Sequence, residues 1–78
     1  MSNEELLAAA RTPGDKCEAC FYIGERVRLE HTLAEAVPWY QQCIEQNERD
    51  YWEDRLARAR LESAKSLDAG QQDAAHEN

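Results

Sequence analysis

The sequence predicts an all-α domain of about four helices that pack as antiparallel helix-turn-helix pairs. Apolar residues recur at the three- and four-residue spacing of amphipathic helices, and no segment has the pattern of a strand. Short polar clusters that contain helix-capping residues separate the apolar segments. Of the 78 residues, 42% are hydrophobic and 32% are charged, a balance that favours a folded helical domain over a disordered chain.

The first helix is predicted at residues 4–11, where Glu, Leu and Ala are good helix formers and Ser2 or Asn3 can cap the start. Residues 12–15, Thr-Pro-Gly-Asp, are predicted to form a turn, because Pro fixes φ, Gly can take positive φ and Asp can cap the next helix. The second helix is then predicted at about residues 16–30. Its apolar positions are Cys20, Phe21, Ile23, Val27 and Leu29.

The third helix is predicted to follow a capping box, in which Thr32 and Glu35 satisfy each other's backbone amides. It should end near Gln46 or Asn47. Pro38 removes one backbone hydrogen bond inside it, at a cost of about 3 kcal/mol in a regular helix interior, so we expect a kink or a tightened first turn. The apolar stripe of this helix comprises Leu33, Ala36, Val37, Tyr40, Cys43 and Ile44.

The fourth helix is predicted at residues 51–66, after a break at residues 47–50 in which Asp50 is the expected N-cap. Residues 67–78 are mostly small or polar, which predicts a disordered tail. The predicted organisation is therefore one helical domain at residues 1–66 followed by a polar tail. The apolar positions of the fourth helix are Trp52, Leu56, Ala57 or Ala59, and Leu61.

One run of residues has the spacing of a known repeat. Cys20, Ile23, Gly24 and Val27, followed by Ala36 and Tyr40, overlay the pattern W-x2-L-G-x2-Y and A-x3-F. Residues 17–50 thus resemble one complete tetratricopeptide repeat, and residues 17–25 are similar to the opening of such repeats in bacterial proteins. Residues 4–11 and 51–66 resemble the adjoining halves of a preceding and a following unit. The departures are Cys20 for a large aromatic residue, Val27 for Tyr and Glu48 for the closing Pro.

The small residues of this pattern have a packing role. Gly24 and Ala36 let two helices approach closely where they cross, and Tyr40 fills the adjacent gap. The resemblance itself implies a concave groove, lined by the first helix of each repeat, that receives a peptide or a partner helix. Carried over by position, the partner-binding residues are Phe21, Glu25, Arg28, Trp52 and Arg55.

Two interpretations of these residues carry equal weight. Aromatic and arginine side chains are the types that dominate binding energy at interfaces. Trp52 can equally cover the core of a small domain, with the arginines solvated. The expected function is that of a protein-protein interaction module or adaptor.

Charge narrows the range of partners. Sixteen acidic and nine basic residues give a net charge of -7, which disfavours nucleic acid, since the one short basic group is Arg55, Arg58 and Arg60. A small acidic inhibitor or chaperone that acts on a basic partner is the alternative function. No run of about 18 apolar residues is present and the N-terminus is acidic, so we expect no membrane association and a cytoplasmic location.

The three cysteines raise a second alternative. Cys17-x-x-Cys20 can form a redox site at a helix N-terminus, and with His31 and Cys43 it offers a Cys3His set for zinc. The βαβ context of redox motifs is missing and the zinc spacing is irregular, so buried free thiols are the simpler interpretation. We expect no metal and no cofactor.

Enzymatic activity is not expected. Neither His31 nor His76 is tied by spacing to a nucleophile and an acid, and no Gly-rich phosphate loop is present.

Self-association is the remaining expectation. Repeats bury a continuous core only by stacking, and about three units are normally needed, whereas this chain has one complete repeat and two halves. A homodimer would cover the open ends. The residues available for such an interface are Leu6, Leu7, Val37, Trp39, Trp52 and Leu61.

Overall fold

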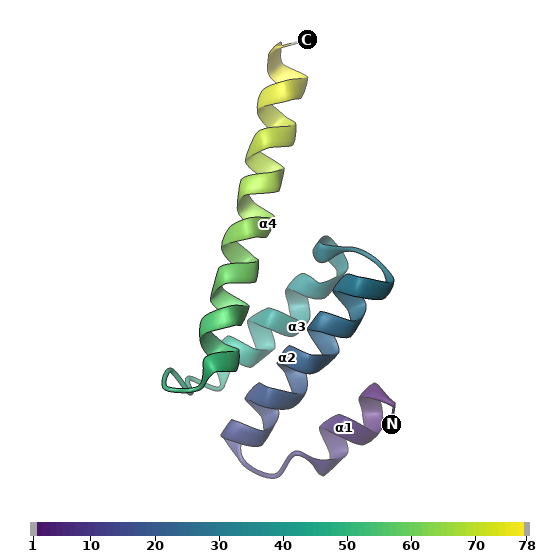
Figure 1. Cartoon of the computed structure of the whole chain (residues 1–78), viewed down its shortest axis with the longest axis vertical. Helices are drawn as coiled ribbons and strands as arrows, with labels where there is room; N and C mark the ends of the chain where they lie inside the picture. The colour runs from purple at the N-terminus through teal and green to yellow at the C-terminus, as the bar shows by residue number, and fades with distance from the viewer. Residues whose placement is uncertain (1, 78) are drawn as a thin grey trace.

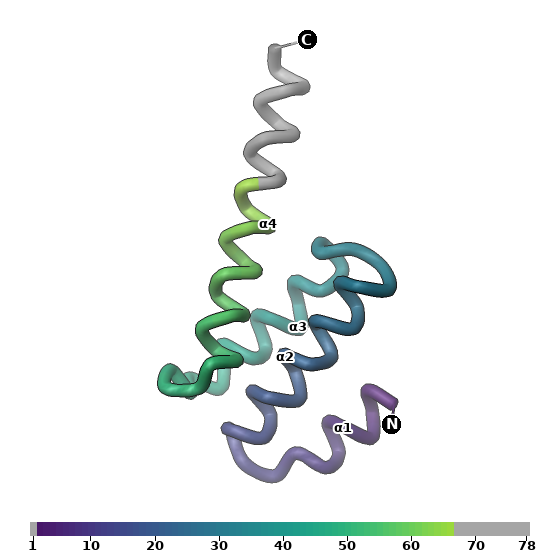
Figure 2. The backbone as a smooth tube through the Cα atoms, viewed as in Figure 1, coloured from purple at the N-terminus to yellow at the C-terminus, as the bar shows by residue number. Residues whose placement is uncertain are grey.

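The computed structural model describes residues 2–66, and these residues form helices without any strand. In chain order the helices are α1 (Asn3–Ala9), α2 (Pro13–Glu30), α3 (Leu33–Glu45) and α4 (Trp52–Glu77), of which α4 is described as far as residue 66 (Figure 1). The predicted all-α fold is confirmed. The predicted tail, residues 67–78, lies outside the described residues, as the grey part of the tube in Figure 2 indicates.

Helix α1 begins with a reciprocal cap. The Ser2 hydroxyl accepts a hydrogen bond from the Glu5 amide at 3.1 Å, and the Glu5 carboxylate accepts one from the Ser2 amide at 3.4 Å. Ser2 is therefore the N-cap of the first predicted helix. The helix ends at Ala9, two residues before its expected end.

Helix α2 begins at Pro13, so the turn predicted at residues 12–15 is wrong. Thr12 is the N-cap, and its hydroxyl accepts a hydrogen bond from the Asp15 amide at 3.0 Å. Pro13 fits the first helical position because its missing N–H needs no partner there. Gly14 lies inside the helix beneath the Tyr51 side chain, where a Cβ would collide with the hydroxyl oxygen of Tyr51. A close contact, and not a positive φ, accounts for this glycine.

Helix α3 has one half of the predicted capping box, since the Thr32 hydroxyl accepts a hydrogen bond from the Glu35 amide at 3.1 Å. The reciprocal half is wrong, because the Glu35 carboxylate lies 3.7 Å from His31 Nδ1 and does not accept from the Thr32 amide. The helix continues through Pro38 as a single element. Both Pro38 and Ala34 are exposed, so the Ala34 carbonyl, which Pro38 leaves without a donor, lies on the water-facing side of the helix. After α3, Asn47 takes a φ of 57°, the left-handed conformation in which many helices end.

Helix α4 begins at Trp52, one residue later than predicted, and Asp50 is not its cap. The Tyr51 carbonyl accepts the first hydrogen bond of the helix, from the Arg55 amide at 3.4 Å. The Tyr51 amide itself donates to the Glu48 carbonyl at 3.0 Å, which closes the preceding turn. Tyr51 is therefore the residue at which this turn meets α4, and its ring packs over Gly14.

Helices α2 and α3 form an antiparallel hairpin with the most extensive interhelical contact of the described residues. Helix α4 packs against both, and α1 contacts α2 (Figure 1). A Cβ on Gly24 would lie 2.8 Å from Tyr40 Cε1 and 3.3 Å from Trp39 Cβ, so α2 and α3 meet as closely as the small residues predicted. The core cluster contains Cys17, Cys20, Phe21, Ala36, Tyr40, Cys43 and Ala57.

Candidate functional site

The five residues predicted to bind a partner fall into three different environments. Phe21 is only 3% exposed and belongs to the core. Its ring centroid lies 5.5 Å from that of Trp52 and 5.7 Å from that of Tyr22, both in edge-on arrangements. Phe21 therefore supports the neighbouring surface from beneath and presents almost no area of its own.

Trp52 lies at the surface, where it forms an aromatic pair with Tyr22. Trp52 is 50% exposed and Tyr22 47% exposed, and their ring centroids are 6.0 Å apart. Leu56, also partly exposed, follows Trp52 by one helical turn, and Arg55 is exposed on the same helix. We call Tyr22, Trp52 and Leu56 the aromatic face. The sequence analysis did not single out Tyr22, because only the contact of α2 with α4 brings it beside Trp52.

Glu25 and Arg28 belong to an ion network that joins three helices. Glu25 on α2 accepts hydrogen bonds from Arg28 Nη2 at 2.9 Å, from Arg60 Nε on α4 at 2.8 Å and from Tyr40 Oη on α3 at 2.7 Å. Both guanidinium groups donate two hydrogen bonds to the carboxylate. Glu25 and Arg28 therefore take part in interactions that hold α2, α3 and α4 together. Arg60, the partner from α4, was missed by the sequence analysis.

The network changes the titration of its members. Burial alone would raise the pKa of the Glu25 carboxyl, but the hydrogen bonds from Arg60, Arg28 and Tyr40 outweigh it and lower the pKa to about 2. Burial, together with the hydrogen bond to Glu25, raises the pKa of Tyr40 to about 12. At neutral pH Glu25 is therefore an ionised acceptor and Tyr40 a protonated donor.

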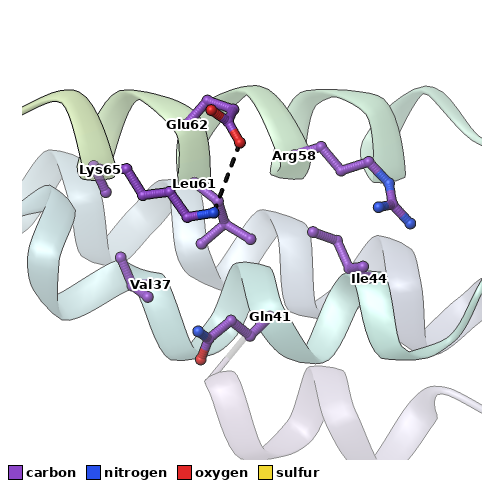
Figure 3. Close-up of a pocket in the computed structure, with 8 residues that line it drawn as sticks. Val37, Gln41, Ile44, Arg58, Leu61, Glu62 and Lys65 are labelled. Atoms are coloured by element: carbon purple, nitrogen blue, oxygen red, sulfur yellow. Dashed lines mark ion pairs between the residues drawn. The ribbon is translucent and has the colours of Figure 1, made fainter.

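A groove lies between α3 and α4, on another part of the molecule (Figure 3). It has a volume of about 460 Å³. Apolar side chains from both helices and a polar margin line it, and Lys65 and Glu62 form an ion pair at 3.8 Å on this margin. We call it the α3–α4 groove. Its lining residues are Val37, Gln41, Ile44, Arg58, Leu61, Glu62, Ala64 and Lys65.

The sequence analysis had named Val37 and Leu61 for self-association, but it had not assembled this groove. The remaining lining residues come from two helices that are separate in sequence, and the crossing of these helices brings them together.

An anchored arginine borders the groove. Arg58 Nε donates to Asp54 Oδ1 at 2.7 Å, and the Asp54 side chain is only 1% exposed, whereas 41% of the Arg58 side chain remains exposed. Among the described side chains, none donates to Asp54 Oδ2. The buried Asp54 carboxylate thus fixes Arg58 through its Nε atom, and the guanidinium group lies at the margin of the groove.

The position of Cys17 does not match the alternative of a Cys-x-x-Cys site at a helix N-terminus. Cys17 lies in the second turn of α2, because this helix begins at Pro13, and its sulfur lies 3.0 Å from that of Cys43 on α3. Cys17, Cys20 and Cys43 are buried free thiols. His31 lies fourteen residues along α2 from Cys17, about 21 Å at 1.5 Å per residue, so the Cys3His set is not assembled. In residues 2–66 no group of three or more His, Cys, Asp or Glu side chains has the arrangement of a metal site.

These features define a small all-α protein with two exposed surfaces on the sides of α4. Within the described residues, none of the helices combines the length and the apolar character needed to cross a membrane. Comparisons with protein-family models, curated proteins and solved structures found no match.

Proposed function

We propose that the protein is a protein-binding module whose α3–α4 groove receives one face of an amphipathic helix. The observation that carries the proposal is the groove itself, with its apolar floor between two helices. A volume of about 460 Å³ accommodates a few large side chains, which suits the apolar stripe of a helix better than a whole folded domain.

The spacing of the groove residues supports a helical partner. Val37, Gln41 and Ile44 follow one another at i, i+4 and i+7 along α3, and Arg58, Leu61 and Lys65 do so at i, i+3 and i+7 along α4. A partner helix that places apolar side chains at the same intervals can lay them between these two ridges.

The resemblance to a tetratricopeptide repeat implies a concave groove along α2 and α4, the first helices of their units, but it also gives the α3–α4 groove a role. Gly24 lies against Tyr40 and Ala36 is fully buried, as the packing role of these positions in the pattern requires. If α2 and α3 are one complete repeat, α4 corresponds to the first helix of the next one, and the second helix of that unit would pack along α3 and α4. In this proposal the partner helix takes the place of the helix that would complete the repeat.

A second candidate surface is the aromatic face, which contains the predicted contact residue Trp52. Two adjacent aromatic rings, each about half exposed, are the observation that favours it. The net charge of -7 favours a basic partner on either surface and retains the alternative of an acidic inhibitor or chaperone. Affinity that falls with added salt would support that alternative, and affinity insensitive to salt would contradict it.

A second copy of the chain is one partner of suitable chemistry, because Val37 and Leu61 lie in the groove. Sedimentation equilibrium tests this arrangement directly. A mass of twice 9.0 kDa supports a homodimer, and a monomer over a wide concentration range contradicts it.

The test of the groove uses helical peptides selected for binding to the full chain from a displayed library. Val37→Asp places a carboxylate in the groove, and the matched control Gln42→Asp places one on an exposed position of the same helix. We expect the selected peptides to bind the Val37→Asp variant at least about tenfold more weakly, since a buried unpaired charge is costly, and the control with little change.

Three results separate the interpretations of this experiment. Circular dichroism of both variants establishes that they keep their helices. Unchanged binding to a folded Val37→Asp variant contradicts the groove. Loss of binding in Trp52→Phe or Arg55→Ala, with Val37→Asp unaffected, assigns the interaction to the aromatic face instead.

A further inference from the structure

Two cysteines from different helices meet in the core. Cys17 of α2 and Cys43 of α3 are 26 residues apart in sequence, and their Sγ atoms are 3.0 Å apart. Both side chains are fully buried. A disulfide bond is about 2.05 Å long, so these sulfur atoms need to approach by only about 1 Å to bond.

We propose that Cys17 and Cys43 form an intramolecular disulfide when the protein meets a disulfide oxidant of the glutathione class, and that this bond joins α2 to α3. Cys20 remains a thiol. Cys20 lies three residues after Cys17 on α2 and belongs to the same core cluster. The structure nevertheless pairs the Cys17 sulfur with that of Cys43.

The chemistry is a two-electron exchange. The thiolate of one cysteine attacks a sulfur of the oxidant R–S–S–R, which forms a mixed disulfide and releases the first RS⁻. The second cysteine then attacks the protein sulfur of the mixed disulfide and expels the second RS⁻. The two protein thiols lose two protons, which protonate the two RS⁻ groups to give two RSH. The protein pair is oxidised and the oxidant is reduced.

Access to the pair depends on the start of α4. Ala57 of α4 belongs to the same core cluster as Cys17 and Cys43, and Tyr51, the residue before α4, packs against that cluster. Burial raises the pKa of both thiols, and the negative charge of Asp54 in the first turn of α4 adds to this effect. Asp54 Oδ2 is buried and receives no hydrogen bond from the described side chains. Opening of this turn hydrates the oxygen and so costs less than the separation of a fully paired junction. Oxidation of the folded protein is therefore slow and limited by this opening.

The disulfide bond should stabilise the packing of α3 against α2. A covalent link between α2 and α3 reduces the freedom of the unfolded chain, and the closed loop spans most of the hairpin. For a domain of this size we expect the oxidised protein to melt on the order of 10 °C above the reduced one.

The experiment incubates the reduced full chain with glutathione disulfide, blocks the remaining thiols by alkylation and maps the bond by mass spectrometry. Cleavage after Lys and Arg places Cys17 and Cys20 on residues 17–26 and Cys43 on residues 29–49. A second cleavage after Glu18 separates Cys17 from Cys20. We expect one intramolecular disulfide between Cys17 and Cys43 and one alkylated thiol at Cys20.

Variants provide the controls. Cys20→Ala should keep the cross-link, and Cys17→Ala or Cys43→Ala should lose it. The wild-type map stands even where a variant fails to fold, because it needs no substitution. The proposal is overturned by a bond between Cys17 and Cys20, by disulfides between chains only, or by three thiols that stay free in the folded chain however long the incubation is extended beyond the time that oxidises the urea-unfolded chain. An oxidised protein with an unchanged Tm overturns the predicted link between the bond and stability.

Discussion

The two sides of α3 differ in how completely they are covered. On the side of α2 the contact is closed, since a methyl group on Gly24 would lie 2.8 Å from the Tyr40 ring. On the side of α4 a groove of about 460 Å³ remains between the helices. Small residues opposite a large aromatic ring make the first contact, whereas the second has apolar side chains on both helices and nothing between them.

The difference shows which contact of α3 is filled by the chain's own side chains and which contact still has space for another group. The α2–α3 contact is internally complementary, so it requires no further molecule. The groove keeps Val37, Ile44 and Leu61 only partly buried, and burial of more of their apolar surface would be favourable at about 25 cal/mol per Å². Added volume should therefore destabilise the protein at the first contact and be accepted at the second.

The largest effect is expected from Gly24→Val. The added carbon atoms have no space against the Tyr40 ring and the Trp39 Cβ, so we expect a loss of about 3 kcal/mol in the free energy of unfolding. Urea denaturation followed by circular dichroism measures it. Ala59→Val is the matched control on an exposed helical position and should lose about 0.5 kcal/mol. A Gly24→Val variant as stable as this control would contradict the close contact.

An intermediate effect on the free energy of unfolding is expected from the Glu25 ion network, which joins α4 to α2 and α3. The folded-state pKa of Glu25, about 2, lies below its usual value of 4.5, so the network stabilises the fold fully above pH 4.5. This contribution, on the order of 2 kcal/mol after allowance for partial exposure, is lost as the pH falls from about 4.5 to about 2.

Denaturation curves recorded across this pH range test the network. Glu25→Gln should be less stable at neutral pH and should lose most of the acid dependence. Glu18→Gln, at an exposed position of the same helix, should retain the wild-type profile. An acid dependence that is the same in Glu25→Gln and in the wild type would show that other carboxylates cause it.

The smallest effect is expected in the groove. Ala64→Leu adds apolar atoms to an open space, and we expect a gain of about 0.5 kcal/mol in the free energy of unfolding. Ser63→Leu, at an exposed neighbouring position outside the groove, should give no gain. A clear destabilisation by Ala64→Leu alone would mean that the groove is closed in solution, which would also remove the basis of the proposed partner site.

The closed contact was predictable because side-chain size encodes it locally. Gly24, Ala36 and Tyr40 have the spacing of a helix crossing, and Thr32 has the local pattern of an N-cap, so both predictions were confirmed. The turn at residues 12–15 was wrong because Thr-Pro also fits the N-cap and first position of a helix, and a distant ring explains Gly14.

The candidate site was less predictable than the fold. Arg60 reaches Glu25 across 35 residues, and the groove depends on the angle at which α3 and α4 cross. Neither property has a local signal in the sequence. Position in the repeat pattern identified Trp52, which is half exposed, but the same reasoning selected Phe21, whose ring is buried beneath it.

In the proposed complex, the anchored Arg58 has a consequence for the direction in which the partner helix lies. Its contact with the buried Asp54 restricts the side-chain rotamer before any partner arrives, so binding there loses little further side-chain entropy. A helix whose last turn points its free carbonyl groups toward Arg58 would meet a positive charge at its negative end. The same helix in the reverse direction would bring its positive end to that charge, so a single arginine can select the direction in which the partner lies.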